Sequence, residues 1–173
     1  MIKPIMKSEF FLRLPSEDAG PDDAATGQDL LDTLHEHEHE CVGLAANMIG
    51  VRKRVICVKD GNKALLMYNP QILEQVNAYQ TSEGCLSLAG ERPCTRYRRI
   101  KVEYLDENFV HRIKNFSGYT AEIIQHEIEE AALKKEDDTL SQEHLSEIRK
   151  ELAEMREQFG SCLLYTSPSP RDR

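Results

Sequence analysis

The feature that most constrains the fold is the segment Ala121–Asp138, AEIIQHEIEEAALKKEDD, which has helical apolar spacing and contains the pair His126-Glu127. The pair opens the pattern His-Glu-x-x-His, in which the two histidines share a helix face because they lie four residues apart. Two such imidazoles can bind one metal ion, and the glutamate can take a proton from water. In this chain the second histidine position holds Glu130. The segment is therefore a metal site with a substituted ligand, an inactive site, or a sequence that changes identity within the motif.

Two other motifs precede it in the chain: Gly43–Gly50, GLAANMIG, and Glu83–Ser87, EGCLS. Taken alone, a turn of small residues is usually a packing feature, and a lone cysteine is usually a small buried apolar residue. Together with His126, however, the thiolate of Cys85 would be a good ligand for a first-row divalent metal. The combination predicts metal-assisted hydrolysis of an amide, in which the metal lowers the pKa of a bound water to about 7.

Composition restricts the class of protein. The 173 residues are enough for one domain with an appendage. A net charge of −8 argues against a nucleic-acid surface and against a polybasic membrane anchor. The first residues contain no continuous apolar signal region, and no apolar run reaches membrane-spanning length, so we expect a cytoplasmic protein. The 5 cysteines are then expected to be reduced thiols.

Local patterns predict an α+β domain, with strands first and a helix later. Residues 15–28 read as a loop, and 29–40 as an amphipathic helix that leads into a turn at Gly43. A short strand is expected over 54–60, before an Asp-Gly turn. A second extended stretch follows, interrupted at Asn69-Pro70.

The second half of the domain is expected to hold a hairpin and the histidine-bearing helix. Residues 99–116 contain two strand-like runs around Asp106-Glu107-Asn108. Thr120 is the expected N-cap of the helix that follows.

The three motifs, in this order, resemble those of the peptide deformylase family, and the resemblance covers residues 1–128, including RPCTRYRRIKVEYLDEN between the last two motifs. It implies a compact α+β domain with short antiparallel strands around a central metal-binding helix. It also implies removal of the formyl group from N-formylmethionine of nascent proteins, at the ribosome. The cofactor it implies is one ion, Fe2+, with Zn2+ or Ni2+ able to replace it.

Residue roles follow from the same motif matching. Cys85 would be the thiolate ligand and His126 the first imidazole ligand, while Glu127 would be the general acid and base. The backbone N–H of Leu86 would help to hold the oxyanion. Met48 stands where the family usually has a glutamine that donates a hydrogen bond to that oxyanion, although some bacterial members carry a similar motif. Methionine cannot donate one, and loss of such a donor reduces the rate by about two to three orders of magnitude.

Substrate-cleft residues are also implied by the resemblance. Gly43, Glu83 and Gly84 would line the cleft, and Glu83 would form a structural ion pair with Arg96. Glu130 is open to three interpretations. It could be a third metal ligand, since it keeps the i, i+4 geometry. It could instead belong to a solvated helix face, or it could mark the point at which the motif ends.

From residue 128 onward the sequence changes character. Five apolar residues recur at coiled-coil spacing, namely Leu145, Ile148, Leu152, Met155 and Phe159. The segment 128–160 resembles the middle-domain coiled coil of a ClpB-type disaggregase. We therefore expect a deformylase-like domain over 1–128, a coiled-coil-like helical extension over 129–160, and a disordered tail over 161–173 that resembles translated adapter sequence.

Three hypotheses about function remain open at this stage. In the first, the chain is a peptide deformylase with little or no activity, because the second metal histidine is replaced by Glu130. In the second, it is a catalytically inactive deformylase-like protein that binds a coiled-coil partner through residues 139–159. In the third, the chain is chimaeric and joins a truncated deformylase to a fragment of another protein.

Overall fold

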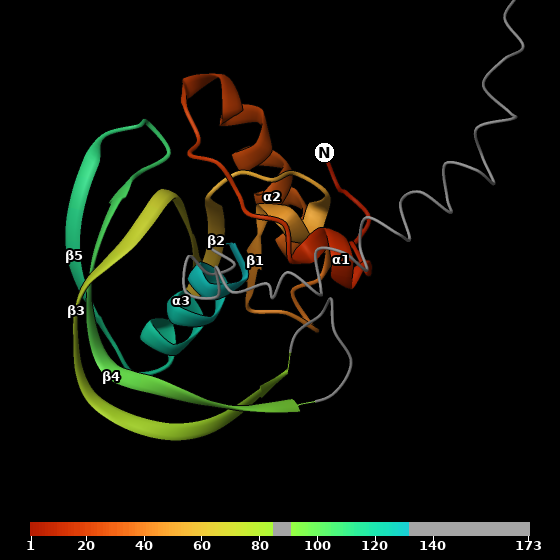
Figure 1. Cartoon of the computed structure of the whole chain (residues 1–173). Helices are drawn as coiled ribbons and strands as arrows, with labels where there is room; N and C mark the ends of the chain where they lie inside the picture. Colours follow the sequence, from red (N-terminus) through yellow and green to blue (C-terminus); the bar gives the residue numbers. More distant parts are fainter. Residues whose placement is uncertain (85–90, 132–173) are drawn as a thin grey trace, which may run out of the picture. The chain divides into compact units, whose positions relative to one another are not determined.

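An antiparallel sheet with the strand order β1-β2-β3-β4-β5 forms the framework of the fold (Figure 1). The computed structural model describes residues 1–84 and 91–131, which lie in the unit Met1–Lys134, whereas the unit Lys135–Arg173 falls outside the described residues. The strands are β1 (Gly43–Ala45), β2 (Val55–Asp60), β3 (Lys63–Gly84), β4 (Glu91–Leu105) and β5 (His111–Ser117). Each strand pairs with its neighbour in sequence, so the sheet is built from successive hairpins. The expected strand over 54–60 and the expected hairpin over 99–116 are confirmed.

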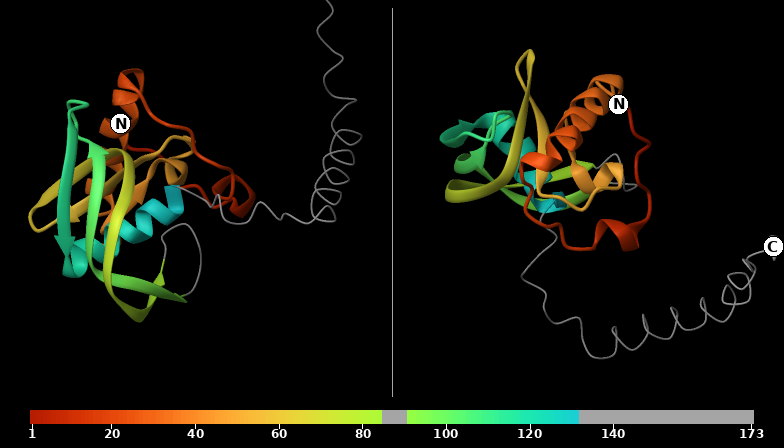
Figure 2. Two further views of the ribbon diagram at one scale, coloured as in Figure 1. Left: turned by 60° about the vertical axis from the view of Figure 1, so that its left-hand side comes forward. Right: turned by 90° about the horizontal axis from the view of Figure 1, so that it is seen from above.

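β3 is longer than the sequence indicates, because the expected break at Asn69-Pro70 is an irregularity within one strand. The register with β4 shifts between Tyr68 and Gln71, where Asn69 has a φ of 51° and the proline offers no N–H to the ladder. Asn69 is held in this conformation by two hydrogen bonds to the backbone of Ala19, of 2.7 and 2.9 Å. Such irregularities bend a strand, and β3 and β4 curve so that α3 lies on their concave side (Figure 1 and Figure 2).

The helices are α1 (Glu9–Leu12), α2 (Ala24–Glu36) and α3 (Gly118–Ala131), and 3-10 turns span Pro21–Asp23 and Ala46–Ile49. The predicted loop over 15–28 and helix over 29–40 were placed too late in the chain. Pro21 begins a 3-10 turn that is closed by a 2.9 Å hydrogen bond from the Gly20 N–H to Asp23, and this turn continues directly into α2. α2 ends at Glu36, and the predicted turn at Gly43 is instead the start of β1.

The N-cap predicted for α3 is also wrong. α3 begins at Gly118, so Thr120 lies in its first turn, and the Thr120 hydroxyl donates a 2.9 Å hydrogen bond to Asp60 at the end of β2. The contact links the start of α3 to the sheet. Within residues 1–84 and 91–131, no helix is long and apolar enough to cross a membrane.

The hydrophobic core lies where the helices α2 and α3 pack against the sheet. β2 contacts α2 and α3, and its residues Val55–Val58 are all buried, which requires cover on both faces because successive strand side chains point to opposite sides. α2 contributes Leu30 and Leu34, and α3 contributes Ile124. The helical extension expected over 129–160 lies outside the described residues beyond Ala131, and so does the tail over 161–173.

Candidate active site

A cleft of about 240 Å³ runs along α3 and is bordered by four segments: the chain entering β1, the 3-10 turn Ala46–Ile49, the end of β3, and α3 itself. It brings together six of the residues predicted from the motifs, namely Gly43, Met48, Glu83, Gly84, His126 and Glu127. Cys85 and Leu86 lie outside the described residues. Glu130 does not line the cleft.

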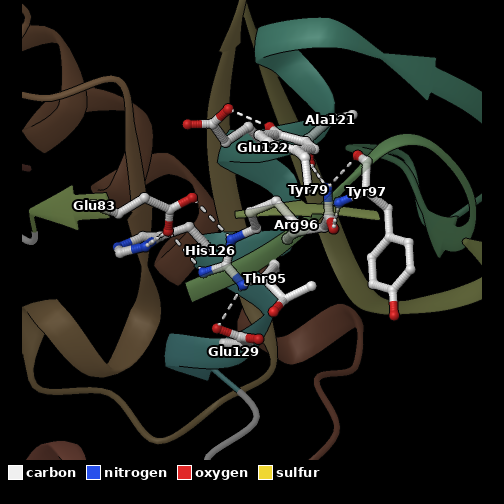
Figure 3. Close-up of polar contacts among 10 residues, drawn as sticks. Tyr79, Glu83, Thr95, Arg96, Tyr97, Ala121, Glu122, His126 and Glu129 are labelled. Atoms are coloured by element: carbon white, nitrogen blue, oxygen red, sulfur yellow. Dashed lines mark hydrogen bonds and ion pairs between the residues drawn. The ribbon is translucent and has the colours of Figure 1, made fainter. Parts of the chain in front are cut away.

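Glu83 connects β4 to the histidine of α3, as the close-up in Figure 3 shows. Arg96 donates to both carboxylate oxygens of Glu83, at 2.8 and 2.7 Å, so the predicted ion pair is present. The second of these oxygens is also 2.8 Å from Nδ1 of His126. Burial would raise the pKa of Glu83, but the hydrogen bonds with His126 and Arg96 outweigh it and lower the pKa to about 2. An ionised carboxylate only accepts hydrogen bonds, so Nδ1 carries the proton.

Arg96 itself is 3% exposed, and it also forms a 2.9 Å ion pair with Glu129 on the next turn of α3. The arginine therefore holds a strand end and a helix together through two carboxylates. This arrangement fixes the plane of the His126 ring. A carboxylate behind a ring N–H is the usual support for a metal-binding histidine.

Glu127 is the most deeply buried acid of the cleft. Its side chain is 3% exposed, and Oε2 has no hydrogen-bond partner among the described residues. Burial raises the pKa of Glu127 to about 8, so the carboxyl group can gain or lose a proton near neutral pH. Gly43 makes room for it, because a Cβ at position 43 would lie 2.6 Å from Oε1 of Glu127.

The GLAANMIG motif is buried except for Gly50, and it packs against α3. Met48 is 1% exposed, and its sulfur accepts a 3.5 Å hydrogen bond from the Ala45 N–H. The neighbouring Asn47, to which no role was assigned from the sequence, donates at 2.6 Å to the carbonyl of Glu130 and at 3.4 Å to that of Leu12. Asn47 therefore ties the motif to the last turn of α3.

Gln125 is a second buried amide whose role the sequence pattern does not indicate. Its side chain accepts from the Tyr97 N–H at 2.9 Å and donates to the Tyr97 carbonyl at 3.0 Å. It also donates at 2.9 Å to the carbonyl of Ala121. A polar residue at a core position of the helix, next to His126, is the sequence signal that could have revealed this link between α3 and β4.

The described donors match a divalent metal site in part. His126 has the carboxylate support that such a ligand needs. Glu130 follows it by one helical turn, and burial raises the pKa of its carboxyl group, against the effect of His126. Within residues 1–84 and 91–131, no three histidine, cysteine or acidic side chains are grouped closely enough to hold an ion. A complete site therefore needs a ligand from beyond these residues.

Comparisons with known proteins point to one family. The family model for polypeptide deformylase matches residues 6–158. A peptide deformylase of Clostridium beijerinckii is 50% identical over 129 residues, which are 75% of this chain and 95% of the relative. A Met-Ala-Ser-bound class I type b peptide deformylase from Acinetobacter baumannii superposes with a TM-score of 0.68 at 27% identity, over 76% of this chain and 94% of that one. The peptide deformylase from Thermotoga maritima gives 0.69 at 26% identity, over 76% and 92%.

Proposed function

The chain belongs to the polypeptide deformylase family, whose members are metal-dependent hydrolases, and on this premise we propose that its cleft removes the formyl group from N-formylmethionyl nascent peptides. The site of action is the cytoplasm, at the ribosome. One observation carries the proposal. Arg96 and Glu83 hold His126 in a fixed orientation beside Glu127, a buried carboxyl group that borders the same cleft and has one oxygen without a hydrogen-bond partner in the described part of the chain.

Cys85 and His126 would hold the metal, with Glu130 in the position of the family's second histidine. The proposed ion is ferrous iron, with zinc or nickel able to replace it. When bound, a divalent ion acts as a Lewis acid toward the formyl carbonyl.

The residues of the chain supply the proton transfers and the orientation. Glu127 takes a proton from the attacking water and returns it to the nitrogen that leaves as the peptide amine. Glu83 accepts a hydrogen bond from the Nδ1–H of His126. This contact turns the other ring nitrogen, Nε2, away from the end of β3. The N–H of Leu86 would hold the developing oxyanion, and Met48 adds no donor beside it.

We propose further that the chain has little activity. A carboxylate in place of the second imidazole reduces metal affinity, and the missing amide donor at position 48 lowers the rate by about two to three orders of magnitude. The test is formate release from formyl-Met-Ala-Ser by protein purified anaerobically with ferrous iron. The deformylase of C. beijerinckii serves as the benchmark. Turnover equal to that of the relative would contradict the proposed low activity.

The role of Glu127 has its own test. Glu127→Gln keeps the shape of the side chain but removes its proton chemistry, and we expect formate release to fall below detection. Glu36→Gln is the matched control, since Glu36 is exposed at the end of α2 and does not border the cleft. Equal rates for the wild type and Glu127→Gln would show that another group moves the proton.

A further inference from the structure

The cleft is lined by more acidic side chains than the proposed hydrolysis requires. Its lining includes Glu40, Glu83, Glu122 and Glu127 and, within the described part of the chain, contains no lysine or arginine. The charge of Glu83 is matched by Arg96, and Glu127 is 3% exposed and already has a role in the proposed hydrolysis. Glu40 and Glu122 are therefore the carboxylates whose charge acts on a molecule in the cleft.

These two differ in how strongly water screens them. The side chain of Glu40 is 66% exposed at the rim and lies 3.5 Å from His37. Glu122 lies on α3, is only partly exposed, and accepts a hydrogen bond from the hydroxyl of Tyr79 (Figure 3). The guanidinium of Arg98 sits over the ring of Tyr79, 5.0 Å from its centroid. Less water around Glu122 means a stronger field inside the cleft.

Tyr79 orients Glu122 without removing its charge. Burial and the neighbouring Glu122 raise the pKa of Tyr79 to about 12, so the phenol stays protonated and acts as a hydrogen-bond donor. A donor of this kind fixes the carboxylate in one place and leaves it negative. The carboxylate is thus preorganised to meet a cation.

Position along the helix indicates which part of a peptide would meet this charge. Glu122 and His126 are four residues apart on α3 and share a face, about 6 Å apart along the axis. The buried Oε2 of Glu127, which has no hydrogen-bond partner within residues 1–84 and 91–131, marks the end of the cleft that takes the reacting group. In an extended peptide the residue after formylmethionine lies about 7 Å from the formyl group, a distance that the stem of a lysine easily covers.

We propose that Glu122 is a specificity-determining residue that favours formylated peptides with lysine or arginine directly after the formylmethionine. The inference rests on the proposed function, because it assumes that the formyl group lies beside His126 and Glu127. It predicts that a cationic side chain is preferred and that an anionic one is excluded by like-charge repulsion.

The test compares three peptides, formyl-Met-Lys-Ser, formyl-Met-Ala-Ser and formyl-Met-Glu-Ser, by kcat/KM for formate release and by calorimetric binding. For the wild type we expect the lysine peptide to exceed the glutamate peptide by about fivefold in both measurements, the strength of a modestly screened ion pair. In Glu122→Gln, which can still accept the Tyr79 hydrogen bond, this ratio should fall toward one. Glu36→Gln removes the same charge outside the cleft and should keep the wild-type ratio.

The results separate the two proposals. If no peptide is hydrolysed, the proposed function fails, and the binding ratio alone decides the role of Glu122. Hydrolysis or binding without a preference for lysine overturns the inference. A preference that persists unchanged in Glu122→Gln also overturns it, because the selecting charge would then lie elsewhere.

Discussion

Replacing Gly43 by alanine tests whether the close approach of β1 and α3 shapes the active site. The new Cβ would lie 2.8 Å from Cγ of Glu127 and 2.8 Å from Cγ2 of Ile123. Carbon atoms in contact are normally about 3.5 to 4.0 Å apart, so both contacts are short by about 0.7 to 1.2 Å. Neither side can retreat easily, because Gly43 pairs with Val58 in the sheet and both α3 side chains are buried.

The expected effect on stability follows from this overlap. Adding a methyl group to a filled core site destabilises a protein by about 1 to 3 kcal/mol, which lowers the melting temperature of a chain this size by about 3 to 10 °C. The clash also displaces the Glu127 carboxyl group, and a shift of about 1 Å in a reacting group can reduce the rate about a hundredfold. Formate release should therefore fall more than stability alone would explain.

The assay is thermal unfolding followed by circular dichroism, together with formate release at a temperature where every variant is folded. Gly20→Ala is the control, because a Cβ there meets no atom within 4 Å and the backbone is extended, with a φ of −125°. It should leave both measurements unchanged or stabilise slightly, by about 0.4 to 1 kcal/mol. A Gly43→Ala variant that melts within one degree of the wild type, roughly the precision of the method, would refute the steric reasoning.

Three further predictions concern Glu130, Arg96 and Asp106. Glu130→His should increase the iron bound per chain after anaerobic loading, measured by elemental analysis, and unchanged metal content would show that the missing imidazole is not limiting. Arg96→Met leaves a buried carboxylate without its cation and should reduce the free energy of unfolding in urea by about 3 kcal/mol, whereas the exposed Arg92→Met should change it by less than about 0.5 kcal/mol. Burial would raise the pKa of Asp106, but hydrogen bonds from Arg112 and two backbone N–H groups outweigh it and lower the pKa. The stability that Asp106 contributes is therefore present above its ordinary pKa of 3.8 and is lost as pH falls through the lowered value, so unfolding measured across acidic pH should show this loss in the wild type and not in Asp106→Asn.

The sequence predicted the elements whose signals are local. The alternation around Asp106-Glu107-Asn108 is a local turn signal, and β4 and β5 pair across that turn. The apolar run of β2 ends at Asp60, directly before a glycine, so the position of this strand could also be predicted from the sequence. The site residues that could be predicted are those that belong to short motifs. The cleft brings together four of them, Gly43, Glu83, His126 and Glu127.

The misplaced elements depend on contacts between segments that are far apart in the chain. Asn69-Pro70 reads as a break because neither residue favours a strand, yet Ala19 binds the asparagine side chain from 50 residues away and β3 continues. Thr120 has the chemistry of an N-cap, but its hydroxyl is engaged by Asp60 across the fold. Asn47 and Gln125 likewise take their roles from backbone groups of other segments. Periodicity carries no information about such partners.

The partner of Glu83 shows where reasoning from strand register stops. In the β3–β4 ladder the residue opposite Glu83 is Arg92, and a prediction from pairing alone would join these two. The carboxylate binds Arg96 instead, four residues along β4 and on the same face of the strand. Arg92 is exposed, so an ion pair with it would contribute at most about 1 kcal/mol, while Arg96 is buried beneath α3 and would be strongly destabilising without a partner. Glu83 therefore pairs with the buried arginine, Arg96, and not with the exposed one. Because α3 covers Arg96, the orientation of His126 depends on the packing of the helix against the sheet.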